Sequence, residues 1–336
     1  MSLPPSEIPS GAMRFNSDSQ KLEYYDGAQW LQVSTFSPNL NGGARGLFGG
    51  GFGPSPVGEV NEIEYINIAS TGNSLDFGDL QQTRQALSSL GSSTRGFWVG
   101  GRSAPTDFNI IEFVTFSSLG DYTDFGDLSS GKQGPFGLSN ATRGIAGGGT
   151  FTSTVDYFTM SSTGTVATFG TLTPSNLGTY QSACMTPIRG VYRQSLGPPP
   201  TYSGTTFLGN ITIATTGDST KFGDLQQARA TDASLSNSTR GIFAGGYQPF
   251  TASIEYVELT SQGNGVSFGD LTSARNNLNG NCTSPTRGVI AGGSTPSSIN
   301  NIEYVTIQTQ GNAVDFGDLL NPRSYKSGIS NAHGGL

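Results

Sequence analysis

The sequence predicts an all-β fold, a six-bladed β-propeller preceded by a small β module, and three observations lead to it. Arg-Gly recurs at 45, 95, 143, 189, 240 and 287, with spacings of 50, 48, 46, 51 and 47 residues, and Phe-Gly recurs inside each copy. No copy contains a stretch with helical periodicity. The chain holds 49 glycines and only 12% charged residues. A repeat of this length made of short strands is typical of propeller blades.

Four strands can be assigned within each copy, most clearly in the one that starts at Arg240. Arg240 to Gly246 is an apolar run that ends in two glycines, and Ser253 to Leu259 alternates apolar with polar residues, as a half-buried strand does. A turn is predicted at Ser261 to Gly265 from its composition. Val266 to Leu271 is the third strand and Asn276 to Thr283 the fourth. Such a sheet is too small to be stable alone and has to pack against its neighbours.

The closure of the ring follows from the position of the fourth strand. The step from each Phe of Phe-Gly to the next Arg of Arg-Gly is 18 to 20 residues, and this interval contains the fourth strand. One more such strand, Tyr325 to Ala332 within residues 324–332, follows Phe316, and the copy that starts at Arg45 lacks a preceding one. We therefore expect the C-terminal strand to pair beside Gly46 to Gly50. Ser37 to Asn41, where Leu40 has the right offset from Arg45, is the competing candidate.

The order of motifs within a copy resembles the kelch repeat. An apolar run ends in Gly245-Gly246, a tyrosine follows at Tyr256, Phe268 stands where kelch repeats usually have tryptophan, and an arginine follows at Arg275. The resemblance covers residues 45 to 332 and lies in the periodic pattern, since every copy lacks the tryptophan. It implies that the fourth strand is innermost and lines an axial channel.

The first 33 residues differ from the repeats, so we divide the chain into three parts. Residues 1–10 are Pro-rich and are interpreted as an extended docking peptide, 11–33 as a module of three short strands, and 34–336 as the propeller. The module resembles a short β module found near the termini of tailed-bacteriophage fibres and other virion proteins. The matching residues are Arg14, Asn16, Glu23, Gly27 and Trp30. The resemblance implies attachment to the virion, through Leu3, Pro4, Pro5, Ile8, Arg14 and Trp30.

Composition excludes several classes of function. The net charge of -7 and the pI of 4.7 argue against binding to a nucleic-acid backbone, which needs basic patches. No apolar run approaches 18 residues, and the N-terminus has no signal-peptide pattern, so we expect no membrane insertion. Cys184 and Cys282 stand at positions where other copies have leucine, which predicts two buried free thiols.

The repeated polar residues predict structural roles. Asp79, Asp127, Asp224, Asp270 and Asp318 follow Phe-Gly, and Glu64, Glu112, Glu255 and Glu303 precede a strand aromatic. Groups that recur in every blade cannot converge on one reaction centre, so we interpret them as turn caps and inter-blade ion pairs. With His333 the only histidine, and no pairing evident among the non-repeated acids Glu59, Glu62, Asp107, Asp121 and Glu258, we expect no catalytic residues, metal or cofactor.

The loops between the first two strands of each copy vary most and are the candidate binding surface. They are Gly51–Glu59, Arg102–Asn109, Thr150–Thr154, Gln194–Thr205, Tyr247–Ala252 and Ser294–Asn300. They carry the candidate ligand-binding residues Phe52, Phe108, Phe151, Tyr202, Tyr247 and Phe250. Variable loops on a constant scaffold are typical of binding proteins, and aromatic faces among polar neighbours suit a glycan. The fourth copy diverges most, through either drift or a contact surface.

The combination of the N-terminal module with the Gly-rich repeats resembles appendage proteins of tailed bacteriophages, cyanophages in particular. The resemblance implies a non-enzymatic virion structural protein, a tail or fibre appendage. Its N-terminal region would bind other virion proteins, and its loop face would adhere to a host surface polysaccharide. We expect it in the virion, after assembly in the host cytoplasm, and a homo-oligomer is compatible with this role. The alternatives are a purely architectural capsid, neck or baseplate protein and, least favoured, a carbohydrate-active enzyme.

We predict that deletion of residues 322–336 unfolds the whole repeat region, because the first sheet loses a strand and its neighbours lose their packing partner. Circular dichroism and thermal denaturation of the truncated chain test this. A melting temperature equal to that of the full chain would contradict it.

Overall fold

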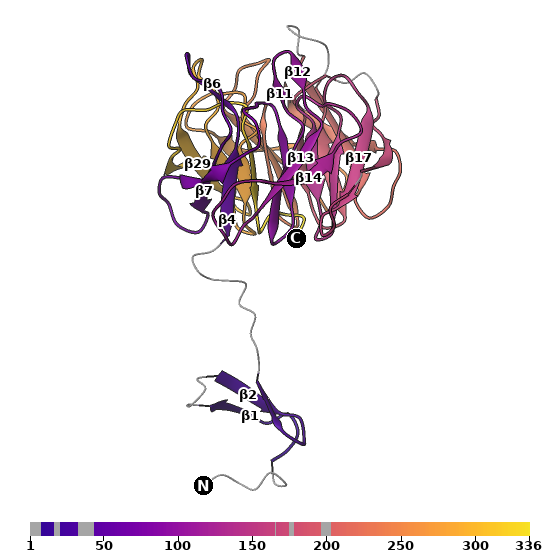
Figure 1. Cartoon of the computed structure of the whole chain (residues 1–336), viewed down its shortest axis with the longest axis vertical. Coiled ribbons are helices and arrows are strands. Elements are labelled where there is room, and N and C mark those ends of the chain that lie inside the picture. The colour runs from indigo at the N-terminus through magenta and orange to yellow at the C-terminus, as the bar shows by residue number, and fades with distance from the viewer. Residues whose placement is uncertain (1–7, 17–20, 33–43, 165, 175–177, 196–202) are drawn as a thin grey trace. The chain divides into compact units, whose positions relative to one another are not determined.

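The computed structural model describes residues 8–16, 21–32, 44–164, 166–174, 178–195 and 203–336. The chain forms two compact units, Met1–Gly42 and Gly43–Leu336 (Figure 1). The sequence places this boundary after Val33. All regular elements of the described residues are strands, which confirms the all-β prediction.

The smaller unit holds a three-stranded antiparallel sheet of β1 (Met13–Asn16), β2 (Lys21–Tyr25) and β3 (Trp30–Gln32). Asp26 shapes the turn between β2 and β3, because its Oδ1 accepts hydrogen bonds from the backbone N–H groups of Ala28 and Gln29, both at 2.8 Å. Residues 17–20, between β1 and β2, lie outside the described residues.

The larger unit is built from six four-stranded antiparallel sheets, numbered here I to VI. Sheet I holds β31 (Ser327–Ser330), β4 (Arg45–Gly49), β7 (Glu62–Asn67) and β8 (Leu75–Asp79), in that order, and sheet II holds β9 (Ser88–Gly91), β10 (Arg95–Val99), β13 (Ile110–Thr115) and β14 (Thr123–Asp127). Sheet III holds β15 (Phe136–Ser139), β16 (Arg143–Gly147), β17 (Thr154–Thr159) and β18 (Ala167–Thr171), and sheet IV holds β19 (Ser182–Met185), β20 (Arg189–Arg193), β21 (Thr205–Thr212) and β22 (Thr220–Arg229). Sheet V holds β23 (Ala233–Ser236), β24 (Arg240–Ala244), β25 (Ser253–Glu258) and β26 (Val266–Asp270), and sheet VI holds β27 (Asn281–Thr283), β28 (Arg287–Ala291), β29 (Asn301–Thr306) and β30 (Val314–Asp318). Two hairpins, β5 (Phe52–Gly53) with β6 (Gly58–Glu59) and β11 (Arg102–Ser103) with β12 (Thr106–Asp107), lie outside these sheets.

The sheets are offset by one strand from the sequence copies. The strand that ends one copy becomes the first strand of the next sheet, as β27 does ahead of β28. β31 pairs with β4 in the same way, from Ser327 opposite Gly49 to Ser330 opposite Gly46, which is the pairing that the sequence predicts. The competing segment Ser37 to Asn41 lies outside the described residues. Sheet I therefore joins residues from the two ends of the larger unit.

Each sheet packs its apolar side chains against two neighbouring sheets. Six separate clusters of buried side chains lie between sheets I and II, II and III, III and IV, IV and V, V and VI, and VI and I. The first strands also contact one another in the order β9, β15, β19, β23, β27 and β31, and β31 contacts β9. Because apolar burial is the main favourable term in folding, these interfaces carry most of the stability of the sheets.

Arg-Gly is explained by contacts between neighbouring sheets. A Cβ on Gly190 would lie 2.2 Å from Cδ1 of Leu138, a side chain of the preceding sheet's first strand. The other five glycines face equivalent side chains, in the pairs Gly46 with Cys282, Gly96 with Ile329, Gly144 with Leu90, Gly241 with Cys184 and Gly288 with Leu235. Both cysteines are free and buried, as predicted, and burial raises the pKa of each thiol. In sheet I the first-strand side chain that faces the neighbouring glycine is Ile329. Leu40 was the competing candidate for this position in the sequence.

The arginine of each Arg-Gly extends to the following sheet. Its Nη1 donates a hydrogen bond to a main-chain carbonyl, from Arg45, Arg95, Arg143, Arg189, Arg240 and Arg287 to Phe116, Met160, Ile213, Leu259, Ile307 and Ile68 respectively. The last of these bonds runs from sheet VI to sheet I. Five of the guanidinium groups also lie 4.4 to 4.8 Å from the centroid of an aromatic ring on their own sheet.

Each of five buried ion pairs joins a basic residue that precedes a sheet's first strand to a carboxylate on that sheet's third strand. The pairs are Arg84–Glu112, Lys132–Asp156, Arg229–Glu255, Arg275–Glu303 and Arg323–Glu64. Burial raises the pKa of Glu112 and lowers that of Arg84, so the partner offsets only part of each desolvation cost. Among the described residues, no aspartate after Phe-Gly forms an ion pair with a neighbouring sheet. Four of the five are exposed, and Lys221, the ion-pair partner of Asp224, is on the same strand.

We predict that Gly170→Ala destabilises the larger unit by about 2 kcal/mol or more, since overpacking of this kind costs 1 to 3 kcal/mol. Gly170 belongs to a Phe-Gly, and its new Cβ would lie 2.2 Å from the carbonyl oxygen of Gly217 in the next sheet. Gly263→Ala is the matched control, because among the described residues no atom beyond its two chain neighbours lies within 4 Å of its Cβ position. Thermal denaturation of both variants measures the difference, and equal melting temperatures would contradict the interface.

Candidate functional site

The variable loops that the structure describes connect the second and third strands of the sheets in the larger unit. In Figure 1 the hairpin elements β6, β11 and β12 are at the upper end of this unit, and the C-terminus is at its lower end. We call the end that carries these hairpin elements the loop face.

Three of the predicted ligand-binding aromatics are exposed on loops of two sheets. Phe151, in the loop of sheet III, is 46% exposed, and Tyr247 and Phe250, in the loop of sheet V, are 43% and 46% exposed. Phe52 and Phe108 are partly buried; the backbone of Phe52 exchanges two hydrogen bonds with Ser324, of 2.7 and 3.0 Å. Tyr202 lies outside the described residues.

The structure describes three of the six predicted attachment residues, Ile8, Arg14 and Trp30. Arg14 lies 4.2 Å from the centroid of the Trp30 ring and forms an ion pair of 2.8 Å with Glu23, so Arg14 and Trp30 contact each other. Ile8 is partly buried, and Leu3, Pro4 and Pro5 lie outside the described residues. The opposite face of this sheet, which we call the bare face, carries the exposed side chains Met13, Phe15, Leu22 and Tyr24, and the strand register places Met13 beside Tyr24 and Phe15 beside Leu22.

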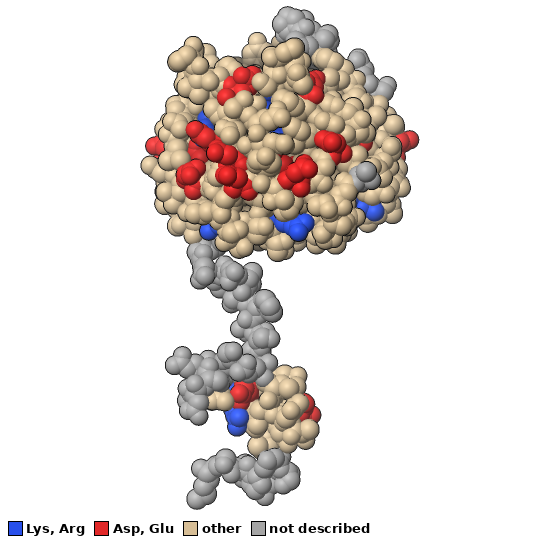
Figure 2. Space-filling model, in the orientation of Figure 1, with Lys and Arg blue, Asp and Glu red and all other residues tan. Residues whose placement is uncertain are grey.

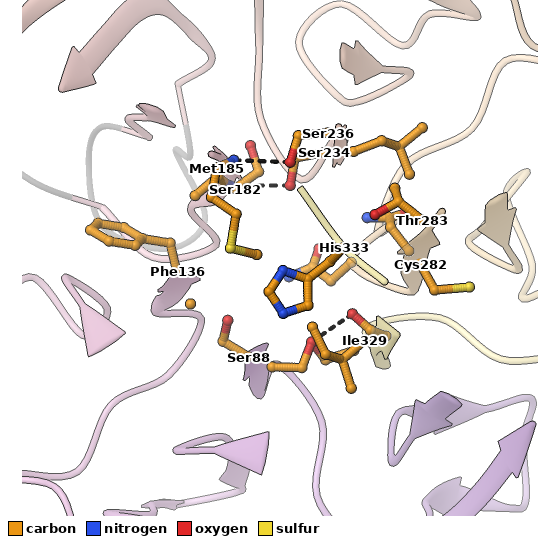
Figure 3. Close-up of a pocket in the computed structure, with 18 of the residues that line it drawn as sticks. Ser88, Phe136, Ser182, Met185, Ser234, Ser236, Cys282, Thr283, Ile329 and His333 are labelled. Carbon is orange, nitrogen blue, oxygen red and sulfur yellow. Dashed lines mark hydrogen bonds between the residues drawn. The ribbon is translucent and has the colours of Figure 1, made fainter. Parts of the chain in front are cut away.

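A polar cavity of about 60 Å³ lies between the first strands of the six sheets (Figure 3). Each strand contributes to its wall, among others through Ser88, Phe136, Ser182, Ser234, Asn281 and Ser327. Several hydroxyls are bonded to neighbouring strands, such as Ser234 Oγ, which accepts a hydrogen bond of 3.1 Å from the backbone N–H of Ala183. The volume is well below the roughly 300 Å³ of the smallest typical ligand pockets. This axial cavity therefore has no room for a saccharide.

Side chains from distant sheets meet at the ends of the first strands. Tyr180, just before β19, and Tyr325, just before β31, have ring centroids 5.2 Å apart, although these two strands are not neighbours. Beyond the other end of β31, His333 lies in the middle of the lining strands (Figure 3). Its Nε2 donates to the carbonyl of Gly91 at 2.8 Å, and its Nδ1 accepts from the N–H of Gly335 at 3.1 Å. Burial lowers the pKa of His333 to about 4, so the ring is neutral at pH 7.

A larger cavity, of about 240 Å³, lies beside the β5–β6 hairpin, and we call it the hairpin pocket. Pro54, Val57 and Val60 line one part of it, and Asn321 and Pro322, from the link between β30 and β31, line another. Glu62 and Arg323 complete the lining and form an ion pair. Sequence reasoning named Glu62 only as one of several non-repeated acids and did not name Asn321 or Arg323. Nothing local to either segment indicates that residues so far apart in the chain meet.

The chain matches no protein-family model and no curated protein. Among the described residues, no group of three or more His, Cys, Asp or Glu side chains is arranged to hold a metal ion. In the same part of the chain, no helix has the length and apolar character needed to cross a membrane. The case for a function therefore rests on the two surfaces and the pocket described above.

We predict that His333 makes stability fall between pH 7 and pH 5. Its folded pKa of about 4 is below the unfolded value near 6.5, so its stabilising contribution is complete above about pH 6.5 and is lost as the pH falls toward 4. At pH 5 the loss is about 2 kcal/mol. Chemical denaturation of wild type and His333→Gln over this range measures it, since the carboxylates are the same in both proteins. Parallel pH profiles would show that His333 is not buried in neutral form.

Proposed function

We propose that the six sheets are the blades of a kelch-like β-propeller that the C-terminal strand closes. The pairing of β31 with β4 and the apolar cluster between sheets VI and I support this proposal. So does the hydrogen bond from Arg287 to Ile68, which repeats between these sheets the contact made at the other five interfaces. In this arrangement the axial cavity lies on the ring axis, and the loop face is one flat side of the ring.

The propeller then serves, in our proposal, as the adhesive part of a non-enzymatic virion protein of a tailed bacteriophage. One observation carries the binding role: the exposed aromatic side chains Phe151, Tyr247 and Phe250 lie on loops that vary between copies, while the sheets below them repeat. Aromatic rings that stay exposed beside polar neighbours suit the C–H faces of sugars. We therefore propose a host surface polysaccharide as the ligand.

The small module is proposed to attach the protein to other virion proteins. Its resemblance to phage-fibre modules supports this role, and so does its bare face. Met13 and Phe15 on that face are 62% and 67% exposed, and a sheet of three short strands gains stability when a partner covers its apolar side. The Arg14–Trp30 contact on the other side stabilises the module itself.

We predict that the purified protein binds components of an array of bacterial surface polysaccharides. The double substitution Tyr247→Ala and Phe250→Ala is expected to weaken this binding at least about tenfold, since stacked aromatic rings contribute about 1 kcal/mol or more each. Leu75→Ala with Val266→Ala, two exposed side chains on outermost strands, is the matched control. If the wild type binds no component of the array, the adhesive function fails and a purely architectural role is favoured.

A further inference from the structure

The hairpin pocket has the dimensions of a site for one small group. At about 240 Å³ it is four times larger than the axial cavity of about 60 Å³. It is smaller than the roughly 300 to 1,000 Å³ of typical pockets for drug-sized ligands. The β5–β6 hairpin that forms one wall belongs to the variable loop of sheet I, so the pocket is part of the loop face.

The net charge of the ion-pair cluster at this pocket differs from the net charge at the equivalent positions of the other blades. Arg84, Lys132, Arg229 and Arg275, which occupy the position of Arg323, each pair with one carboxylate. Arg323 instead pairs with two, those of Glu64 and Glu62. The equivalents of Glu62 are neutral, as at Ser253 and Asn301, where the side chain contacts the basic group through an uncharged oxygen. One negative charge is therefore left over at the hairpin pocket.

The surplus charge is accessible. Glu64 is buried, whereas the side chain of Glu62 is 44% exposed. Asp79 lies opposite Glu62 in the strand register, and burial, together with the nearby carboxylates of Asp121, Asp76 and Glu62, raises its pKa. Figure 2 shows acidic side chains in a band across the visible side of the larger unit. The surroundings therefore reinforce the negative charge rather than cancel it.

Lys326 is the basic group that could have neutralised this cluster. It is fully buried, its amine donates a hydrogen bond to the carbonyl of Ala291, and burial lowers its pKa to about 7. Its charge is thus incomplete at neutral pH. Lys326 also does not line the hairpin pocket. Among the described residues that line the pocket, Arg323 is the only basic one.

The remaining lining is suited to a sugar ring. Val57 and Pro54 on the hairpin and Pro322 on the opposite link present apolar surface, which can contact the C–H face of a pyranose. The exposed Asn321 offers an amide that can both donate to and accept from ring hydroxyls. An aliphatic amine such as a lysine side chain would use the carboxylate but leave this amide and part of the pocket empty.

We propose that the hairpin pocket binds an amino sugar, with its protonated amine on the carboxylate of Glu62, its hydroxyls on Asn321 and its ring against Val57 and Pro322. This inference rests on the proposed glycan-binding function and names the sugar class that one site on the loop face selects. It uses none of the aromatic side chains to which we assign adhesion above. A free amine is required, because a hydrogen bond from a cationic donor to a carboxylate is about twice as strong as a hydrogen bond between neutral groups.

Titration of the full chain by isothermal calorimetry or ligand-observed NMR tests the pocket with four probes: glucosamine, N-acetylglucosamine, glucose and Nα-acetyl-lysine amide. Glucosamine is expected to bind at least about tenfold more tightly than the other three, and more weakly as salt is added. Absence of glucosamine binding at millimolar concentration, or equal affinity for N-acetylglucosamine, would overturn the proposal. Equal affinity for the lysine derivative would also overturn it, because the site would then recognise an ammonium group and not a sugar.

Substitutions separate this site from the rest of the loop face. Glu62→Gln is expected to weaken glucosamine binding about tenfold or more while leaving Arg323 paired with Glu64. Glu258→Gln is the matched control, since that glutamate is 45% exposed, pairs with Arg240 and lies outside the pocket. If Glu62→Gln leaves glucosamine binding unchanged, the pocket assignment fails. Polysaccharide binding that depends on Tyr247 and Phe250 would stand in that case, so the two proposals fail independently.

Discussion

The contact between a glycine of one sheet and a first-strand side chain of the sheet before it is the constraint on which the larger unit depends. At all six interfaces the second strand has no side chain at the glycine, and a leucine, isoleucine or cysteine of the neighbour fills the space. This lets the sheets approach closely enough for their apolar faces to pack against each other. The arginine next to each glycine then bonds to a carbonyl of the following sheet, so one dipeptide orients a sheet toward both neighbours.

The buried ion pairs help to orient each sheet relative to its neighbour, although the burial of these charges has a cost in desolvation free energy. Lone buried ions are strongly unfavourable, and Arg84, Lys132, Arg229, Arg275 and Arg323 each lie where a carboxylate of the next sheet can pair with them. In sheet IV, Gly209 stands where the third strands of the other sheets have the carboxylate, and the side chain of Tyr192 occupies the space. A Cβ on Gly209 would lie 2.2 Å from Cζ of Tyr192, whose hydroxyl hydrogen-bonds to Ser219 at 2.8 Å. Arg193, the last residue of β20 in the same sheet, forms a different ion pair of 2.5 Å with Asp232, in the link to sheet V. The copy that diverges most in sequence thus keeps a filled and bonded interface by other residues.

The repeat made much of the fold predictable, because the same strands, turns and interface glycines recur six times and each copy reinforces the assignment of the others. The pairing of the C-terminal strand with the segment after Arg45 could be predicted by counting strands. The hairpin pocket could not, because Glu62 and Arg323 meet only once strands from the two ends of the unit share a sheet. The sequence also could not predict which of the loop aromatic side chains are exposed. Phe52 and Phe151 occupy comparable loops, yet the first is held against Ser324 and the second is exposed.

The doubly paired Arg323 and the hairpin pocket both lie where the link from sheet VI enters sheet I. Native-state hydrogen exchange tests the closed ring most directly, because an open row of sheets frays at its ends whereas a ring has none. A closed ring predicts that the amides of β4 and β31 exchange as slowly as those of β15 and β16, through global unfolding alone. Amides of β4 and β31 that exchange by local opening, orders of magnitude faster than those of β15 and β16, would contradict the ring.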